Sequence, residues 1–118
     1  MRLVVTRSKS MKRSLDELCD ALEGQNSPRD LCGIKTSLAL LYAEYSGILE
    51  NCLIEKAEKW EDFRKDATSD TQAERKWERT EEGMGETVTK LRMKKIEKLL
   101  SAVSSKIQVA EMEAKNMY

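Results

Sequence analysis

The sequence predicts an all-α protein in which a short N-terminal helix accompanies a long antiparallel helical hairpin with coiled-coil-like packing. Charged residues make up 36% of the 118 residues, with one Pro and five Gly, a composition typical of long amphipathic helices. Two stretches also place apolar residues at alternating steps of three and four, the spacing of helices that pack lengthwise on one another. We therefore expect about three quarters or more of the chain to be helical, with no sheet.

The first helix is predicted at residues 14–23. Ser14 precedes Glu17 by three positions, which is the spacing of a capping box. Gly24 is expected to end this helix in the left-handed conformation. The buried face would comprise Leu15, Leu18, Cys19 and Leu22. Residues 1–13 form a basic arm, for which we favour a solvated tail.

The second helix is predicted at residues 28–67. Ser27 is the expected N-cap, Pro28 suits the first helical position, and Asp30 places negative charge near the positive end. Gly47 is a candidate kink. The apolar seam of this helix comprises Leu31, Ile34, Leu38, Leu41, Tyr45, Ile48 and Cys52. Past Cys52 the seam continues on a rotated face, as at a stutter in a coiled coil.

The third helix is predicted at residues 71–117. The chain is expected to reverse at residues 68–71, with Asp70 or Thr71 as the cap, and residues 83–85 are the alternative place. The second seam comprises Met93, Ile96, Leu100, Val103, Ile107, Ala110, Ala114 and Met117. Residues 14–118 would form one domain. Because two helices cannot cover both apolar stripes, we expect a homo-oligomer, as a dimeric bundle.

Charge is unevenly distributed along this neutral chain. Residues 1–43 carry a net charge of +2, residues 44–86 of −6 and residues 87–118 of +4. Charges separated in this way serve either to orient a binding partner or to form ion pairs within the fold, but they identify no ligand.

The residue types argue against catalysis. The chain has no His, and therefore lacks the commonest general base and metal ligand. No serine or cysteine lies in a nucleophile motif, and no Gly-rich loop suits a phosphate. The acidic pairs Glu58/Glu61 and Glu78/Glu81 resemble those with which all-α nucleoside triphosphate pyrophosphohydrolases hold magnesium, but basic residues interleave them, which favours a solvated face. We expect no enzyme, no cofactor and no metal.

The three cysteines have no metal-ligand spacing. Cys52 lies on the first seam and Cys32 beside it, so we expect both to be buried as small hydrophobic side chains. Free thiols fit a reducing compartment, and we expect the cytoplasm. No run approaches the roughly 20 apolar residues of a membrane span, so no membrane partner is expected.

Two groups of residues are candidates for binding. The first is a basic stripe that could follow a phosphate backbone or pair with Glu44 and Glu50 of the other helix. It comprises Lys90, Arg92, Lys94, Lys95 and Lys98. The second is aromatic, because Trp60 and Trp77, with Phe63, are interleaved with cations. These rings would anchor a partner or, as we favour, pack on one another across the hairpin.

The sequence thus predicts a non-enzymatic helical interaction protein, acting as an adaptor, inhibitor or assembly factor on a protein partner. The alternative is a nucleic-acid-binding accessory factor of DNA or RNA metabolism that uses the stripe at residues 90–98. In size and helical economy the chain resembles many small accessory proteins of bacteriophages and other mobile elements.

Overall fold

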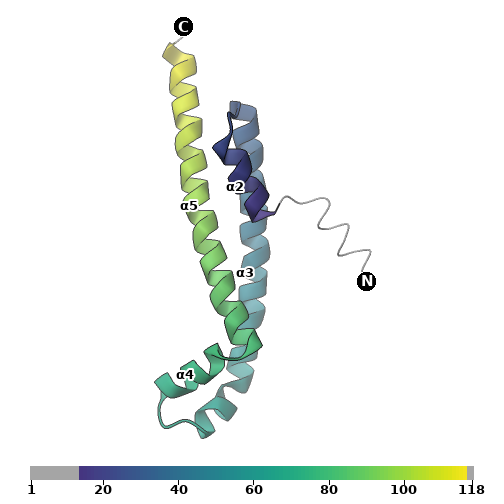
Figure 1. Ribbon diagram of the computed structural model, residues 1–118, viewed down its shortest axis with the longest axis vertical. Coiled ribbons are helices and arrows are strands. Elements are labelled where there is room, and N and C mark those ends of the chain that lie inside the picture. The colour runs from purple at the N-terminus through teal and green to yellow at the C-terminus, as the bar shows by residue number, and fades with distance from the viewer. Residues whose placement is uncertain (1–13, 117–118) are drawn as a thin grey trace, which may run out of the picture. The chain divides into compact units, whose positions relative to one another are not determined.

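A computed structural model describes residues 14–116. Within this range it contains four helices and no strand: α2 (Leu15–Glu23), α3 (Pro28–Lys65), α4 (Asp70–Glu78) and α5 (Glu81–Asn116), as Figure 1 shows. Of the described residues, 89% are helical, which confirms the predicted all-α class. The predicted basic arm at residues 1–13 and Met117 of the second seam lie outside the described residues.

The starts of α2 and α3 follow the predicted capping signals. The backbone N–H of Glu17 donates to Ser14 Oγ at 3.2 Å. Ser27 and Asp30 cap α3 reciprocally, each backbone N–H donating to the other side chain at 3.1 Å. Pro28 is the first residue of α3, where its missing N–H costs nothing.

The predicted left-handed cap at Gly24 is wrong. Gly24 has φ −81° and ψ 180°, which is extended backbone. The amide of Asn26 supplies the missing donor instead: its Nδ2 donates to the carbonyl oxygens of Ala21 at 2.9 Å and Gly24 at 3.0 Å. A side chain beyond the helix therefore satisfies the carbonyls that a left-handed residue would have satisfied.

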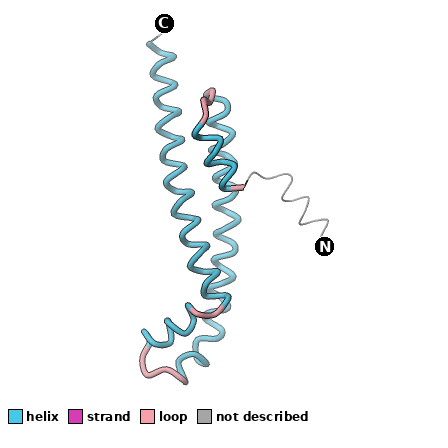
Figure 2. The backbone as a smooth tube through the Cα atoms, viewed as in Figure 1, coloured by secondary structure: helices cyan, strands magenta, loops and turns pink. Residues whose placement is uncertain are grey.

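Helix α3 runs without interruption through Gly47 and ends at Lys65 rather than at residue 67. The loop that follows, at residues 66–69, overlaps the position predicted at residues 68–71, and Figure 2 shows it between α3 and α4. Ser69, not Asp70 or Thr71, is the N-cap of α4, because its Oγ accepts from the backbone N–H of Gln72 at 3.2 Å.

The single helix predicted at residues 71–117 is divided in the structure into α4 and α5. Thr80 lies at the break, where its Oγ1 donates to the carbonyl of Trp77 at 2.6 Å and accepts from the N–H of Gly83 at 3.0 Å. One hydroxyl therefore ends α4 and caps α5. Gly83 and Gly85, the alternative break, both lie inside α5.

By its internal contacts the chain forms two compact units, and α3 and α5 contribute to both. Unit 1 comprises residues 14–42 with 95–116, and unit 2 comprises residues 43–94. The fully buried side chains of unit 1 are aliphatic and come from three helices: Leu18, Ile34, Leu38, Ile96 and Val103. Lys106 Nζ also donates to the carbonyl of Leu22 at 2.7 Å, which ties α5 to the end of α2.

Unit 2 has a different core. Trp77 and Ala73 of α4 are fully buried, and the Trp77 ring meets the Phe63 ring of α3 edge to face, with centroids 5.9 Å apart. Glu86 and Thr89 of α5 are buried beside this apolar part. The buried side chains of this unit are therefore two apolar and two polar residues.

The first predicted seam is buried only along its unit 1 half. Leu31, Ile34, Leu38 and Leu41 are buried, whereas Tyr45 and Cys52 are half-buried. Ile48, which the seam placed in the core, is 42% exposed. The inward face changes after Tyr45, before Cys52 where the sequence placed the change, and Ile48 is therefore turned toward solvent.

Candidate functional site

The basic stripe divides into two parts. Lys90 Nζ lies 3.4 Å from Glu86 Oε2 of its own helix, and the guanidinium of Arg92 lies 5.8 Å from the ring centroid of Tyr45. Lys94, Lys95 and Lys98 are exposed, and no residue in the described range forms an ion pair or hydrogen bond with them. The internal pairing considered for the stripe therefore occurs at Lys90, with Glu86 as the acid.

The aromatic candidates also divide. Trp77 is fully buried, so the structure contradicts its assignment as a surface binding residue. Its ring packs on Phe63 and not on Trp60, which is half-buried under the ammonium group of Lys56, 5.8 Å from the ring centroid. The core interpretation of these rings therefore applies to Trp77, with a different partner from the one expected.

A cluster of charges around the buried Glu86 in unit 2 was not predicted. Lys56 of α3 pairs with Glu74 of α4 and lies 3.9 Å from Glu86 Oε1 of α5. Glu86 is almost fully buried, and its Oε1 accepts no hydrogen bond in the structure. A buried carboxylate is stable only beside cations, so Lys56 and Lys90 together fix its position. The sequence signal was the second seam itself, because Glu86 and Thr89 extend it backward from Met93.

Two side chains have shifted proton affinities. The phenol of Tyr42 donates to Glu97 Oε1 at 2.8 Å, and this hydrogen bond raises the pKa of Tyr42. Burial, followed by the charges of Glu55, Glu86 and Glu82, raises the pKa of the Cys52 thiol. Both shifts favour the neutral form, so neither group is activated as a nucleophile at neutral pH.

The remaining cysteines are free thiols as well. Cys32 is exposed, contrary to the expectation that it is buried, because it lies one position beyond the buried Leu31 on a helix.

An apolar stripe lies on the outside of α5 in unit 2. Met84, Val88 and Leu91 follow one another at steps of four and three, which places them on one helix face. Met84 is 59% and Leu91 61% exposed, and Val88 is also exposed. We call these three residues the α5 surface. Sequence reasoning missed it, although the spacing was available, because the surrounding residues are strongly charged.

Unit 2 also has a groove of about 390 Å³ along α3. We call it the α3 groove. Its lining residues are Ser46, Leu49, Glu50, Leu53, Ile54 and Ala57 of α3 and Met93 of α5. Most of these side chains are aliphatic, so the groove suits an apolar surface of another macromolecule better than a polar metabolite.

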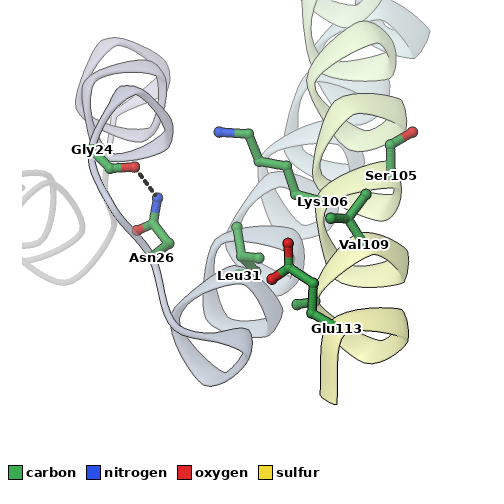
Figure 3. Close-up of a pocket in the computed structure, with 8 residues that line it drawn as sticks. Gly24, Asn26, Leu31, Ser105, Lys106, Val109 and Glu113 are labelled. Atoms are coloured by element: carbon green, nitrogen blue, oxygen red, sulfur yellow. Dashed lines mark hydrogen bonds between the residues drawn. The ribbon is translucent and has the colours of Figure 1, made fainter. Parts of the chain in front are cut away.

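A second hollow, of about 340 Å³, belongs to unit 1, where it lies between the residues around Gly24 and the last turns of α5. Figure 3 shows Lys106 and Glu113 on α5, Gly24 and Asn26 opposite them, and Leu31 between the two groups. Since the Lys106 amine already binds the carbonyl of Leu22, this hollow presents no free cation to a ligand.

Within residues 14–116 no three His, Cys, Asp or Glu side chains are grouped so that they could hold a metal ion. In the same range no helix is long and apolar enough to cross a membrane.

Comparison with known proteins gives no further guide. No family model matches the chain, and no curated protein or solved structure matches it either. The function must therefore be argued from the surfaces themselves.

Proposed function

We propose that this is a non-enzymatic helical interaction protein, an adaptor, inhibitor or assembly factor, that binds a protein partner through the α5 surface. The exposure of Met84, Val88 and Leu91 at consecutive positions of one helix face carries this proposal. Single exposed apolar residues are ordinary, but an aligned set with two large side chains about 60% exposed is typical of an interface.

The kind of partner follows from the same residues. A protein surface gains from covering aliphatic side chains, whereas a phosphate backbone needs only cations and hydrogen-bond donors. The lysines that follow along α5, Lys95 and Lys98, would add attraction to an acidic rim around the apolar patch of the partner.

Nucleic acid remains the second candidate. The observation that favours it is the exposure of Lys94, Lys95 and Lys98, each without a partner in the described part of the chain. Lysines without an ion-pair partner in the protein are available to bind phosphate groups. The affinity of such binding falls steeply as the salt concentration rises.

Three further features belong to the proposal. Helices α3 and α5 pair as an antiparallel, coiled-coil-like hairpin; contacts between Tyr42 and Glu97 in unit 1 and between Lys56 and Glu86 in unit 2 support this pairing. The protein acts as a homo-oligomer, which the aliphatic α3 groove supports. It works in the reducing cytoplasm, in keeping with its three free thiols.

Two variants of the full chain separate the candidates in a pull-down from the native source. Met84→Ser/Leu91→Ser removes the apolar patch, and Lys95→Glu/Lys98→Glu reverses the lysines. All four residues are exposed, so circular dichroism should show unchanged helicity. For a protein partner, the apolar variant should lose at least about tenfold in affinity, since hot-spot side chains each contribute that much or more.

For nucleic acid, only the lysine variant should lose binding, and the wild-type affinity should fall steeply with salt. Retention of the same partners by both variants would overturn the proposal.

A further inference from the structure

We propose that the α3 groove binds the same groove of a second copy of this chain, in a two-fold symmetric dimer. The inference rests on the self-association proposed above and adds the face, the symmetry and the residues that meet. It involves residues other than the α5 surface, so the two interfaces are separately testable.

The groove has the form of a helix-packing surface. Ser46, Glu50, Leu53 and Ala57 succeed one another at steps of four, three and four, so they line one side of α3 over about 16 Å. Leu53 and Ile54 are each roughly half exposed, although both line the groove. Small residues at both ends of this row would let a second helix approach closely, and the aliphatic residues between them supply the area to bury.

Charges of opposite sign flank the groove. Glu50 lies on the α3 side. On α5, Met93 lines the groove, and Lys90 and Lys94, which are four residues apart, share the helix face that flanks it. Neither lysine pairs with an acid of α3 in the described structure: Lys90 bonds Glu86 of its own helix, and Lys94 bonds nothing.

Contacts within unit 2 show that Glu50 of α3 and Lys90 of α5 lie at about the same height along the two helices. Tyr45 meets Arg92, and further along α3 Lys56 meets Glu86. Residue numbers therefore rise along α3 as they fall along α5, and Glu50, about midway between Tyr45 and Lys56, lies level with Lys90.

A two-fold axis parallel to the helices uses this arrangement. In such a dimer α3 of one copy packs on α5 of the other, and each residue stays at the same height along the axis. Every neighbouring pair of helices is then antiparallel. Glu50 of each copy then faces Lys90 and Lys94 of the other. An arrangement with α3 on α3 would instead bring Glu50 against Glu50, so the charges select the first arrangement.

Charge exchange tests this geometry in the full-length protein by sedimentation equilibrium over a concentration series. Glu50→Lys and Lys94→Glu each place like charges across the interface twice, so each variant alone should dimerise at least about tenfold more weakly. An equimolar mixture of the two should form a heterodimer of near wild-type affinity, because both charge contacts are then complementary. The double variant Glu50→Lys/Lys94→Glu should recover as well.

Matched controls are available on the same helices. Glu58→Lys of α3 and Lys95→Glu of α5 make the same charge changes on exposed residues that do not line the groove, and should leave dimerisation unchanged. Circular dichroism identifies any variant that has lost its helices, and recovery in the mixture cannot arise from unfolded chains.

A wild-type chain that stays monomeric up to millimolar concentration would overturn both this inference and the proposed self-association. A dimer that ignores the charge exchange, or that the two control variants weaken equally, would overturn the proposed face and leave the self-association and the α5 surface standing.

Discussion

Gly83, in the first turn of α5, lies too close to the last turn of α4 to carry a side chain. A Cβ at this position would lie 1.9 Å from the carbonyl oxygen of Trp77 and 2.9 Å from the Cα of Glu78, so backbone would have to move. Gly83→Ala should therefore lower the free energy of unfolding by roughly 2–4 kcal/mol, measured by urea denaturation.

The matched control for this substitution is Gly85→Ala. Nothing lies within 4 Å of the position that its Cβ would occupy, and Gly85 is also inside α5. Alanine should raise the unfolding free energy there by about 0.5–1 kcal/mol through helix propensity. Changes of the same sign in the two variants would contradict the close approach at Gly83.

Lys56 illustrates how burial changes the energy of an ion pair. It pairs with the half-exposed Glu74 and lies beside the buried Glu86, whereas Lys59, one turn further along α3, pairs with the more exposed Glu82. Lys56→Met should cost on the order of 3 kcal/mol because it leaves Glu86 buried with one cation fewer. Lys59→Met should cost less than about 1 kcal/mol.

Thermal or urea unfolding of the two variants measures this difference. The double variant Lys56→Met/Glu86→Gln should recover part of the loss, because the buried charge is then neutral. Equal costs for Lys56→Met and Lys59→Met would show that the cluster is solvated.

At the scale of single elements, the starts of α2 and α3 were predictable, whereas the break between α4 and α5 was not. Ser14 and Ser27 each lie three residues before an acid, and such capping signals are local in sequence. The division between α4 and α5 depends on one Thr80 hydroxyl and on Gly83 lying against Trp77. These contacts are local, but a single Thr in a strongly charged, helix-favouring stretch does not stand out in the sequence as a helix break.

The two halves of α3 give the third prediction. Leu41 and Ile48 occupy equivalent positions of the predicted seam, but Leu41 is buried and Ile48 is 42% exposed. Leu41→Asp should therefore cost several kcal/mol, as a charge placed in a core does. Ile48→Asp should cost about 1 kcal/mol or less, since water still reaches the carboxylate. Denaturation midpoints test the order, and an equal loss at both positions would mean that the seam is buried throughout.

At the scale of the whole molecule, the periodic pattern predicted the class but not which apolar residues would stay exposed. Ile96 and Leu91 each belong to a series of apolar residues spaced by three and four, but Ile96 is buried and Leu91 is exposed. What distinguishes them is which other helix lies beside each face, and this depends on contacts between residues far apart in the chain. The pair between Glu86 and Lys90 was available from their spacing of four residues on one helix, whereas the burial of Glu86 beside Lys56 of α3 required the structure.

The central claim is that the α5 surface is where this protein meets its partner. A photo-crosslinking amino acid introduced in place of Leu91, in the native source, tests it most directly, with the same substitution at the exposed Glu58 of α3 as the control. We predict a discrete crosslinked species containing one protein partner from position 91 and none from position 58. No crosslinked species from position 91, or the same species in equal yield from both positions, would contradict the claim.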